Sequence, residues 1–189
     1  MPGQTAAPGT PWGKTGSPTA ATAGVDYSIT VRLTDDYYNA IGNTSNDVGL
    51  SLTTNDPYDS PEPDNTATIL QGDTNIQTVY THQFKRADST GWTVSVSTRS
   101  GSYYAPVSTG LIVVDPDSNT GNNHYLLVLL PGETYDPGNV SGGGKLGSPN
   151  STSVLGYATP KTGDIFPVTI LAVDRFYNRV FDTDNPLVR

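Results

Sequence analysis

The sequence predicts an all-β protein, an antiparallel β-sandwich in which one module is nearly complete and a second one has only begun. Three observations lead to this prediction. Short segments alternate apolar and polar residues with a period of two, which places alternate side chains on opposite faces of a strand. Turn residues separate these segments, as the 20 glycines and 15 prolines suggest. The chain also repeats itself over a long distance, and long internal repeats indicate modular architectures.

The internal repeat defines two predicted domains. Pro-Gly-Gln-Thr-Ala-Ala-Pro-Gly at 2–9 matches Pro-Gly-Glu-Thr-Tyr-Asp-Pro-Gly at 131–138 almost position for position. The further matched segments are 13–18 with 144–149, 27–31 with 166–170, and 35–39 with 174–178. We therefore predict a first domain over residues 1–124 and the start of a second, tandem domain over residues 125–189.

The first domain carries most of the predicted strands. Residues 26–34 form the clearest one, with Tyr27, Ile29 and Val31 on its inner face. The other predicted strands are 48–52, 66–70, 77–85, 92–97 and 111–114. In the strand 92–97, Trp92 and the two valines after it are expected to point inward. Residues 2–24 are expected to be extended or loosely turned, with Trp12 packed onto the domain, and the proline-rich segment 55–65 is expected to be a loop.

The second domain opens with the apolar run Tyr125–Leu130, which Pro131 ends. A continuous apolar run of this length suits a strand buried on both faces, or a strand shared between two modules. The Gly/Ser/Thr-rich segment 140–161 follows, and 166–173 then repeats the first strand of the first domain.

The run Ile-Thr-Val-Arg-Leu-Thr-Asp at 29–35, followed by Asn39, resembles the bacterial immunoglobulin-like repeats of invasin- and intimin-type adhesins and of very long bacterial surface proteins. Thr-Gly-Trp-Thr-Val-Ser-Val at 90–96 is similar to the penultimate strand of that family, and the Leu-Leu-Pro-Gly-Glu-Thr joint at 129–134 is similar to the joint between tandem copies. Tyr38 and Tyr177 stand where that family usually has glycine. The resemblance implies immunoglobulin-like sandwiches, an extracellular or cell-surface location and no enzymatic activity.

The same resemblance sets the register of the modules. In such repeats the strand before Pro-Gly opens the next module, so Tyr125–Leu130 opens the second domain and the first domain lacks its own first strand. We accordingly expect the chain to be a piece of a longer protein. A sandwich that lacks an edge strand leaves unpaired backbone groups that can bind another strand.

Composition excludes several classes of function. The net charge of −8 repels phosphate backbones, which argues against nucleic acid and anionic lipid as partners. No apolar run approaches the roughly 18 residues of a membrane span. Without cysteine there are no disulfides and no thiolate metal sites.

No catalytic pattern stands out, so we expect neither an enzyme nor a cofactor. His82 and His124 are the only imidazole bases, they lie in no recognisable motif, and we expect them to be exposed residues of the sheet. The acidic residues Asp56, Asp59, Glu62 and Asp64 lie in the proline-rich loop, which is a poor place to fix two carboxylates. The glycine-rich segment 142–145 lacks the strand and helix of a phosphate loop.

Two further patterns allow alternatives. Asp115, Asp117 and Asn119 provide oxygen ligands at alternate positions, as in calcium loops, but the closing glutamate is missing and an ordinary turn accounts for the same residues. Asn43, Asn139 and Asn150 fit the pattern of N-glycan acceptors.

The expected function is therefore that of a structural repeat in a long extracellular protein or filament, acting as a spacer or assembly module. Its expected partners are neighbouring repeats or copies of itself. The candidate strand-pairing interface consists of Tyr125, Leu126, Leu127, Val128, Leu129 and Leu130. The alternative is an adhesin or carbohydrate-binding module that recognises a glycan or receptor. Its candidate binding residues are the tyrosines at turns, Tyr37, Tyr38, Tyr103, Tyr104 and Tyr177.

Overall fold

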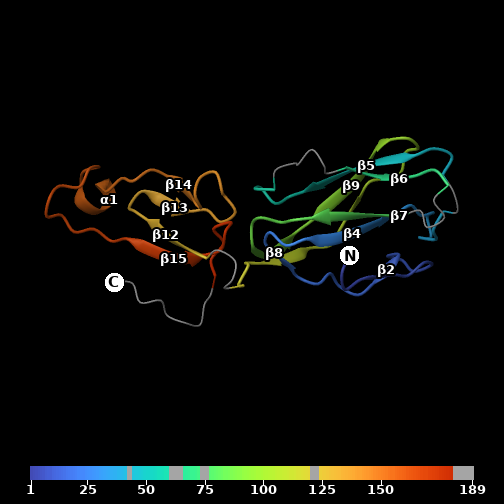
Figure 1. The fold of residues 1–189 in the computed structure, drawn as a ribbon, viewed down its shortest axis with the longest axis horizontal. Coiled ribbons are helices and arrows are strands. Elements are labelled where there is room, and N and C mark those ends of the chain that lie inside the picture. The colour runs from blue at the N-terminus through green and yellow to red at the C-terminus, as the bar shows by residue number, and fades with distance from the viewer. Residues whose placement is uncertain (42–43, 60–65, 73–76, 120–123, 181–189) are drawn as a thin grey trace. The chain divides into compact units, whose positions relative to one another are not determined.

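The computed structural model describes residues 1–41, 44–59, 66–72, 77–119 and 124–180 (Figure 1). In these residues strands dominate, and the single helix is α1 (Thr152–Leu155). The predicted all-β class is confirmed. The strands are β1 (Thr5–Ala6), β2 (Lys14–Thr15), β3 (Ala21–Thr22), β4 (Tyr27–Arg32), β5 (Val48–Thr54), β6 (Thr66–Ile69), β7 (Gln77–His82), β8 (Asp88–Trp92), β9 (Val94–Ser100), β10 (Val107–Ser108), β11 (Ile112–Asp115), β12 (Tyr125–Leu129), β13 (Glu133–Tyr135), β14 (Lys145–Gly147) and β15 (Thr169–Val173).

The chain divides into two compact units. The first contains Met1–Phe84 and Asp88–Asp115, and the second contains Lys85–Ala87 and Pro116–Arg189. No helix in the described residues is both long and apolar enough to cross a membrane.

The first unit is sandwich-like. It contains a four-stranded antiparallel sheet in the order β10-β9-β5-β6, a pair of β4 with β7, and a three-stranded sheet in the order β3-β11-β8 (Figure 1). Side chains from all three sheets are buried, with Ile29, Leu52, Ile69 and Ile112 at most 2% exposed, and Phe84, just after β7, is 0% exposed. Burying a side chain of this size contributes roughly 1.5–3 kcal/mol, so this core accounts for much of the stability of the unit.

Strand β4 confirms the period-two prediction. Its residues alternate between buried and exposed from Tyr27 to Arg32, with Ile29 and Val31 inward. Its partner β7 runs antiparallel, from Tyr27 opposite His82 to Arg32 opposite Gln77.

The single strand predicted over 92–97 is wrong, because the structure has two strands there in different sheets. β8 pairs with β11, and β9 pairs with β5. Thr93, between the two strands, takes no part in the pairing of either sheet. Its N–H donates to Asn55 Oδ1 at 2.7 Å, and its carbonyl accepts the Asn55 N–H at 3.3 Å. Val94 is buried as predicted, but Trp92 is only half-buried since it lies before this break.

The N-terminal segment is more ordered than its composition suggested. β1 and β2 form an antiparallel hairpin, and β3 pairs in parallel with β11. The expectation that Trp12 packs onto the domain is wrong, because its side chain is 77% exposed at the hairpin turn.

The second unit is built on two antiparallel pairs. β12 pairs with β15 from Tyr125 opposite Val173 to Leu129 opposite Thr169, and β13 pairs with β14. Leu127 is buried, whereas Leu126 and Val128 on the other face are 57% and 43% exposed. The alternative that both faces of this strand are buried within its own module is therefore wrong for this unit.

The two segments that match in sequence also share local geometry. The Gln4 N–H donates to the Met1 carbonyl at 3.0 Å, and the Glu133 N–H donates to the Leu130 carbonyl at 3.0 Å. Downstream, Asp35 accepts the Asn39 N–H at 2.9 Å, and Asp174 accepts the Asn178 N–H at 2.9 Å.

The tyrosines that replace the expected glycine adopt its backbone conformation. Tyr38 and Tyr177 both have φ of 63°, and they are the non-glycine residues with positive φ in the described chain. Each ring covers a glycine of the preceding hairpin, Gly13 under Tyr38 and Gly144 under Tyr177, so tightly that an added Cβ there would meet the ring or its Cβ.

Candidate functional site

The predicted interface strand, β12, has one free edge in the described structure. β15 is the strand that pairs with it, and no other described strand does. In an antiparallel pair, about half of the backbone groups of each strand point away from the partner. β12 therefore presents unpaired backbone groups along one edge and exposed apolar side chains on one face, which are the features of a strand that can bind another chain.

A lysine and a glutamate hold the end of β12. Lys145 Nζ lies 2.9 Å from Glu133 Oε1 and donates to the Val128 carbonyl at 3.4 Å. Glu133 Oε2 accepts the Leu130 N–H at 2.9 Å. The Leu130 N–H, followed by Lys145, lowers the pKa of Glu133 below its ordinary value. The hairpin of β13 and β14 thus uses this ion pair to fix the strand that precedes it.

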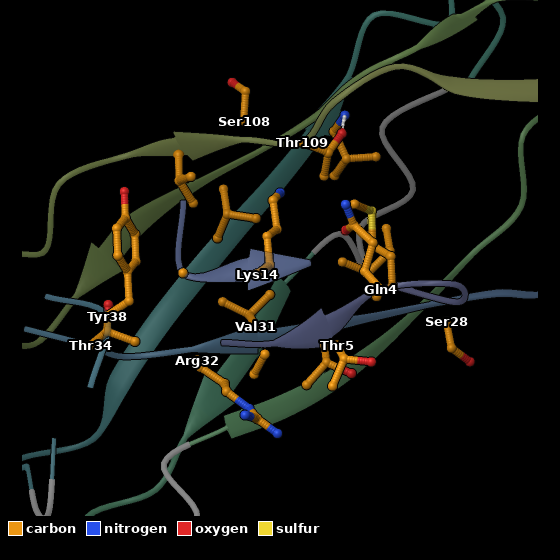
Figure 2. Close-up of a pocket in the computed structure, with 18 of the residues that line it drawn as sticks. Gln4, Thr5, Lys14, Ser28, Val31, Arg32, Thr34, Tyr38, Ser108 and Thr109 are labelled. Carbon is orange, nitrogen blue, oxygen red and sulfur yellow. Dashed lines mark hydrogen bonds between the residues drawn. The ribbon is translucent and has the colours of Figure 1, made fainter. Parts of the chain in front are cut away.

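The corresponding place in the first unit is an open groove. A cavity of about 460 Å³ lies along β4, between this strand, the β1–β2 hairpin and β10 (Figure 2). Val31, Val94 and Val96 form its apolar wall, and the backbone of β4 from Ser28 to Arg32 lines it. Of the described strands, β7 alone pairs with β4, so the β4 edge that faces away from β7 is unpaired.

Lys14 lies in this groove (Figure 2). In the sequence repeat Lys14 corresponds to Lys145 and Gln4 corresponds to Glu133. The neutral Gln4 cannot form the ion pair that Glu133 forms. Among the described residues, Lys14 Nζ has neither a hydrogen-bond acceptor nor a carboxylate within ion-pair distance. The groove therefore contains a cation whose counterpart in the second unit donates to a strand carbonyl.

His82 is buried, so its expected place on the exposed sheet surface is wrong. Its side chain is 6% exposed, its Nε2 lies 3.2 Å from Asp59 Oδ2, and its ring packs edge-on against Phe84 at 4.5 Å. Sequence reasoning missed this pair because the two residues come from different elements. The pair joins the end of β7 to Asp59, and both side chains are almost closed to solvent. His124 is half-buried, and its Nε2 contacts the Asp117 carbonyl at 3.0 Å.

The acidic loop is only partly described. Asp56 is buried and its Oδ1 accepts the Tyr58 N–H at 3.0 Å, while Glu62 and Asp64 lie outside the described residues.

Two of the candidate calcium ligands, Asp117 and Asn119, form hydrogen bonds within the protein. Asp117 Oδ1 accepts the Asn119 N–H at 3.0 Å, as in an ordinary Asx turn, and the Asp117 N–H donates to Asp174 Oδ2 at 3.0 Å. Across the described ranges, no three His, Cys, Asp or Glu residues are grouped so that they could hold a metal ion.

The candidate glycan acceptors and sugar-binding tyrosines differ in exposure. Asn139 is buried and its Nδ2 donates to Asp136 Oδ2 at 2.9 Å, which makes it a poor glycan acceptor. Asn150 is exposed, and Asn43 lies outside the described residues.

Among the candidate sugar-binding tyrosines, Tyr37 and Tyr103 are 73% and 80% exposed. Tyr38 is 40% exposed, and Tyr104 and Tyr177 are half-buried.

Comparison of the chain with models of protein families, with curated proteins and with solved structures finds no match.

Proposed function

We propose that this protein is a non-enzymatic structural repeat of a long extracellular or cell-surface protein, and that it acts as a spacer and assembly module of immunoglobulin-like domains. The observation that carries the proposal is the recurrence of one local structure in two places. A Pro-Gly hairpin, a strand and an Asp–Asn turn capped by tyrosine follow one another in both halves of the chain. Proteins that span a distance and connect domains are typically built from repeated structural units. Here the repeated part is a scaffold with its turns and not a pocket.

The partners in this proposal are neighbouring repeats or further copies of the chain. The free edges of β4 and β12 support it, because unpaired strand edges associate with other strands unless they are covered. Head-to-tail association of such edges gives fibres rather than closed dimers.

An exchange of hairpins tests the repeat. A chimera in which residues 2–18, carrying Gln4→Glu to keep the ion pair with the lysine, replace residues 131–149 should keep the second unit folded, with amide exchange at β12 and β15 as slow as in the parent chain. The control carries the same replacement segment in scrambled order and should lose that protection. Equal loss of protection in both chimeras would contradict the proposal that the hairpins are equivalent.

Self-association tests the assembly role. Light scattering and electron microscopy over a range of protein concentrations should show particles that grow with concentration. A chain that stays monomeric throughout would contradict assembly by copies.

A carbohydrate-binding module is the second candidate, and the exposure of Tyr103 supports it, because a stacking platform for a sugar ring must be open to solvent. A glycan array should then give signals that disappear in the Tyr103→Ala and Tyr104→Ala double variant. Signals that persist in this variant, or no signals in either protein, would contradict this candidate.

A further inference from the structure

We propose that the groove beside β4 is an acceptor site for a β-strand, and that its occupant is β12, Tyr125–Leu129, of a second copy of this chain. The inference rests on the proposed function and adds to it the acceptor, the register and the residues that make the contact. It follows from using the second unit as a template for the first.

The template is the pairing of β12 with β15. β15 and β4 are counterparts, because each leads into the same turn, which is closed by a bridge of Val173 with Arg179 in one case and of Thr34 with Ala40 in the other. In the second unit, the edge of β15 carries β12. In the first unit, the described chain leaves the matching edge of β4 without a strand, and the groove lies along that edge.

Moving the pairing of the second unit onto the first gives the register. This pairing uses the edge of β12 that β15 binds in its own unit, so the donated strand leaves β15 when it enters the groove of the other copy. Asp174 corresponds to Asp35, so Leu129, which lies opposite Thr169, would lie opposite Thr30. By the same step Val128 lies opposite Val31 and Leu126 opposite Leu33. Residues directly opposite each other in an antiparallel pair project to the same face. Val31 and Leu33 project into the core, at 8% and 4% exposure.

This register explains why β12 exposes apolar side chains. Leu126 and Val128, which are 57% and 43% exposed in their own unit, would pack against the apolar wall formed by Val31, Val94 and Val96. Leu127, which is already buried in its own unit, would lie on the opposite face, across from Arg32.

Lys14 is consistent with the same placement. Its counterpart Lys145 donates to the Val128 carbonyl of β12. A strand bound in the proposed register places that same carbonyl near Lys14, which otherwise has no acceptor in the described structure. The groove thus matches the strand in apolar contacts, in backbone pairing and in charge.

Met1 marks where the bound strand leaves the groove. Its carbonyl accepts the Gln4 N–H as the Leu130 carbonyl accepts the Glu133 N–H, so Met1 occupies the place of Leu130. A donated β12 therefore fills the groove as far as Leu129 and turns away there.

The first test measures binding of a labelled Tyr125–Leu129 peptide, flanked by lysines for solubility, to the full chain. Fluorescence anisotropy should show saturable binding, and amide exchange in β4 should slow. Changing Leu126 and Val128 of the peptide to Lys should weaken binding by at least about 100-fold, because two charges would enter an apolar wall. In the full chain Lys14→Met should weaken binding about tenfold, the size of one charged hydrogen bond, whereas the control Arg99→Met should not. A peptide that does not bind, or binds equally well with both lysines, overturns the proposal.

The second test fills the groove within one chain. The sequence Tyr-Leu-Leu-Val-Leu is joined directly in front of Met1, and a control extension carries Lys at its second and fourth positions. The first extension should raise the Tm of the first unit by about 5 °C or more and abolish both peptide binding and concentration-dependent assembly; the control should do neither. Assembly that persists with the groove filled overturns the acceptor but leaves the structural role intact. A stabilised chain whose parent never assembles overturns the second copy as occupant, and points to a preceding segment of a longer chain.

Discussion

Asn178 donates to both carboxylate oxygens of Asp174, from its backbone N–H to Oδ1 at 2.9 Å and from Nδ2 to Oδ2 at 3.0 Å, in a turn that is almost closed to water. Asp174 is 0% and Asn178 1% exposed. Asn39 donates to both carboxylate oxygens of Asp35 in the same way, at 2.9 Å and 3.1 Å, but that turn is exposed. Backbone groups of Lys85, Ala87 and Asp117 in the second unit form further hydrogen bonds with the side chains of this buried turn.

This difference predicts unequal costs for the same substitution. Asp174→Ala should destabilise the second unit by about 2–4 kcal/mol, because it leaves buried N–H groups unsatisfied. Asp35→Ala should cost the first unit about 1 kcal/mol or less, since water replaces the lost acceptor. Amide exchange of the two units, measured separately by NMR, reports both values. Equal costs would mean that burial of the turn contributes nothing.

Two adjacent glycines allow a matched test of how tightly Tyr177 packs against the hairpin. Gly143 and Gly144 both have positive φ, 66° and 76°. An added Cβ at Gly144 would lie 2.5 Å from Tyr177 Cβ, whereas at Gly143 it would meet nothing within 4 Å. Gly143→Ala should cost about 1–2 kcal/mol from backbone strain alone. Gly144→Ala should cost about 1–3 kcal/mol more. Denaturant unfolding followed by fluorescence of the tyrosines measures both; an equal cost would show that Tyr177 moves aside freely.

Aromatic residues in the first unit should differ sharply in their contribution to stability. Phe84 is 0% exposed, and Phe84→Ala should cost about 3–5 kcal/mol. Trp12→Ala should change the free energy of unfolding by no more than about 0.5 kcal/mol, as for other surface sites. Trp92→Ala should fall between them because Trp92 is half-buried. Urea midpoints of the three variants, with unchanged slopes, provide the comparison. A larger loss for Trp12 than for Phe84 would contradict the described core.

Glu133 predicts an acid-dependent contribution to the stability of the second unit. Its pKa is lowered in the folded state from an ordinary value of 4.5. A carboxyl with a lowered folded pKa stabilises the protein above its unfolded pKa, and the stabilisation disappears as pH falls through the folded pKa. The difference in unfolding free energy between the parent chain and Glu133→Gln should therefore be present at neutral pH and shrink below about pH 4.5.

Gln4→Glu is the complementary variant. It should create the corresponding ion pair with Lys14. The first unit should then gain a similar contribution to its unfolding free energy, present at neutral pH and lost at low pH. A pH-independent difference for Glu133→Gln would show that the ion pair with Lys145 is not what the variant removes.

The sequence was most informative where one physical signal acted alone. The alternation of Tyr27, Ile29 and Val31 predicted β4 and its inner face, because burial on one side of a strand imposes a period of two. It failed at Trp92, where the same alternation continues across a change of sheet at Thr93 that depends on distant Asn55. It failed for Trp12 because hydrophobicity alone does not show whether a turn lies against the core.

The candidate site was predictable only in part. The apolar run at 125–130 and the repeat identified the strand, but not which face it exposes. The role of Lys145 depends on its contacts with Glu133 and Val128, which lie close together only in the folded structure. The corresponding role of Lys14 can be recognised only by comparing the structures of the two hairpins. The pairing of His82 with Asp59 likewise leaves no local signal.

The parallel pairing of β3 with β11 has a mechanical consequence for the first unit. Ala21 and Thr22 lie opposite Val114 and Asp115, and the Ala23 N–H adds a bond to the Asp115 carbonyl at 2.9 Å. A pull that enters β3 from its N-terminal side and leaves β11 at its C-terminal end drives the two strands in opposite directions along their length. The hydrogen bonds between β3 and β11 are then under shear and share the force, instead of breaking one after another. Under tension this short contact, rather than the longer ladder of β5 and β9, bears the load first.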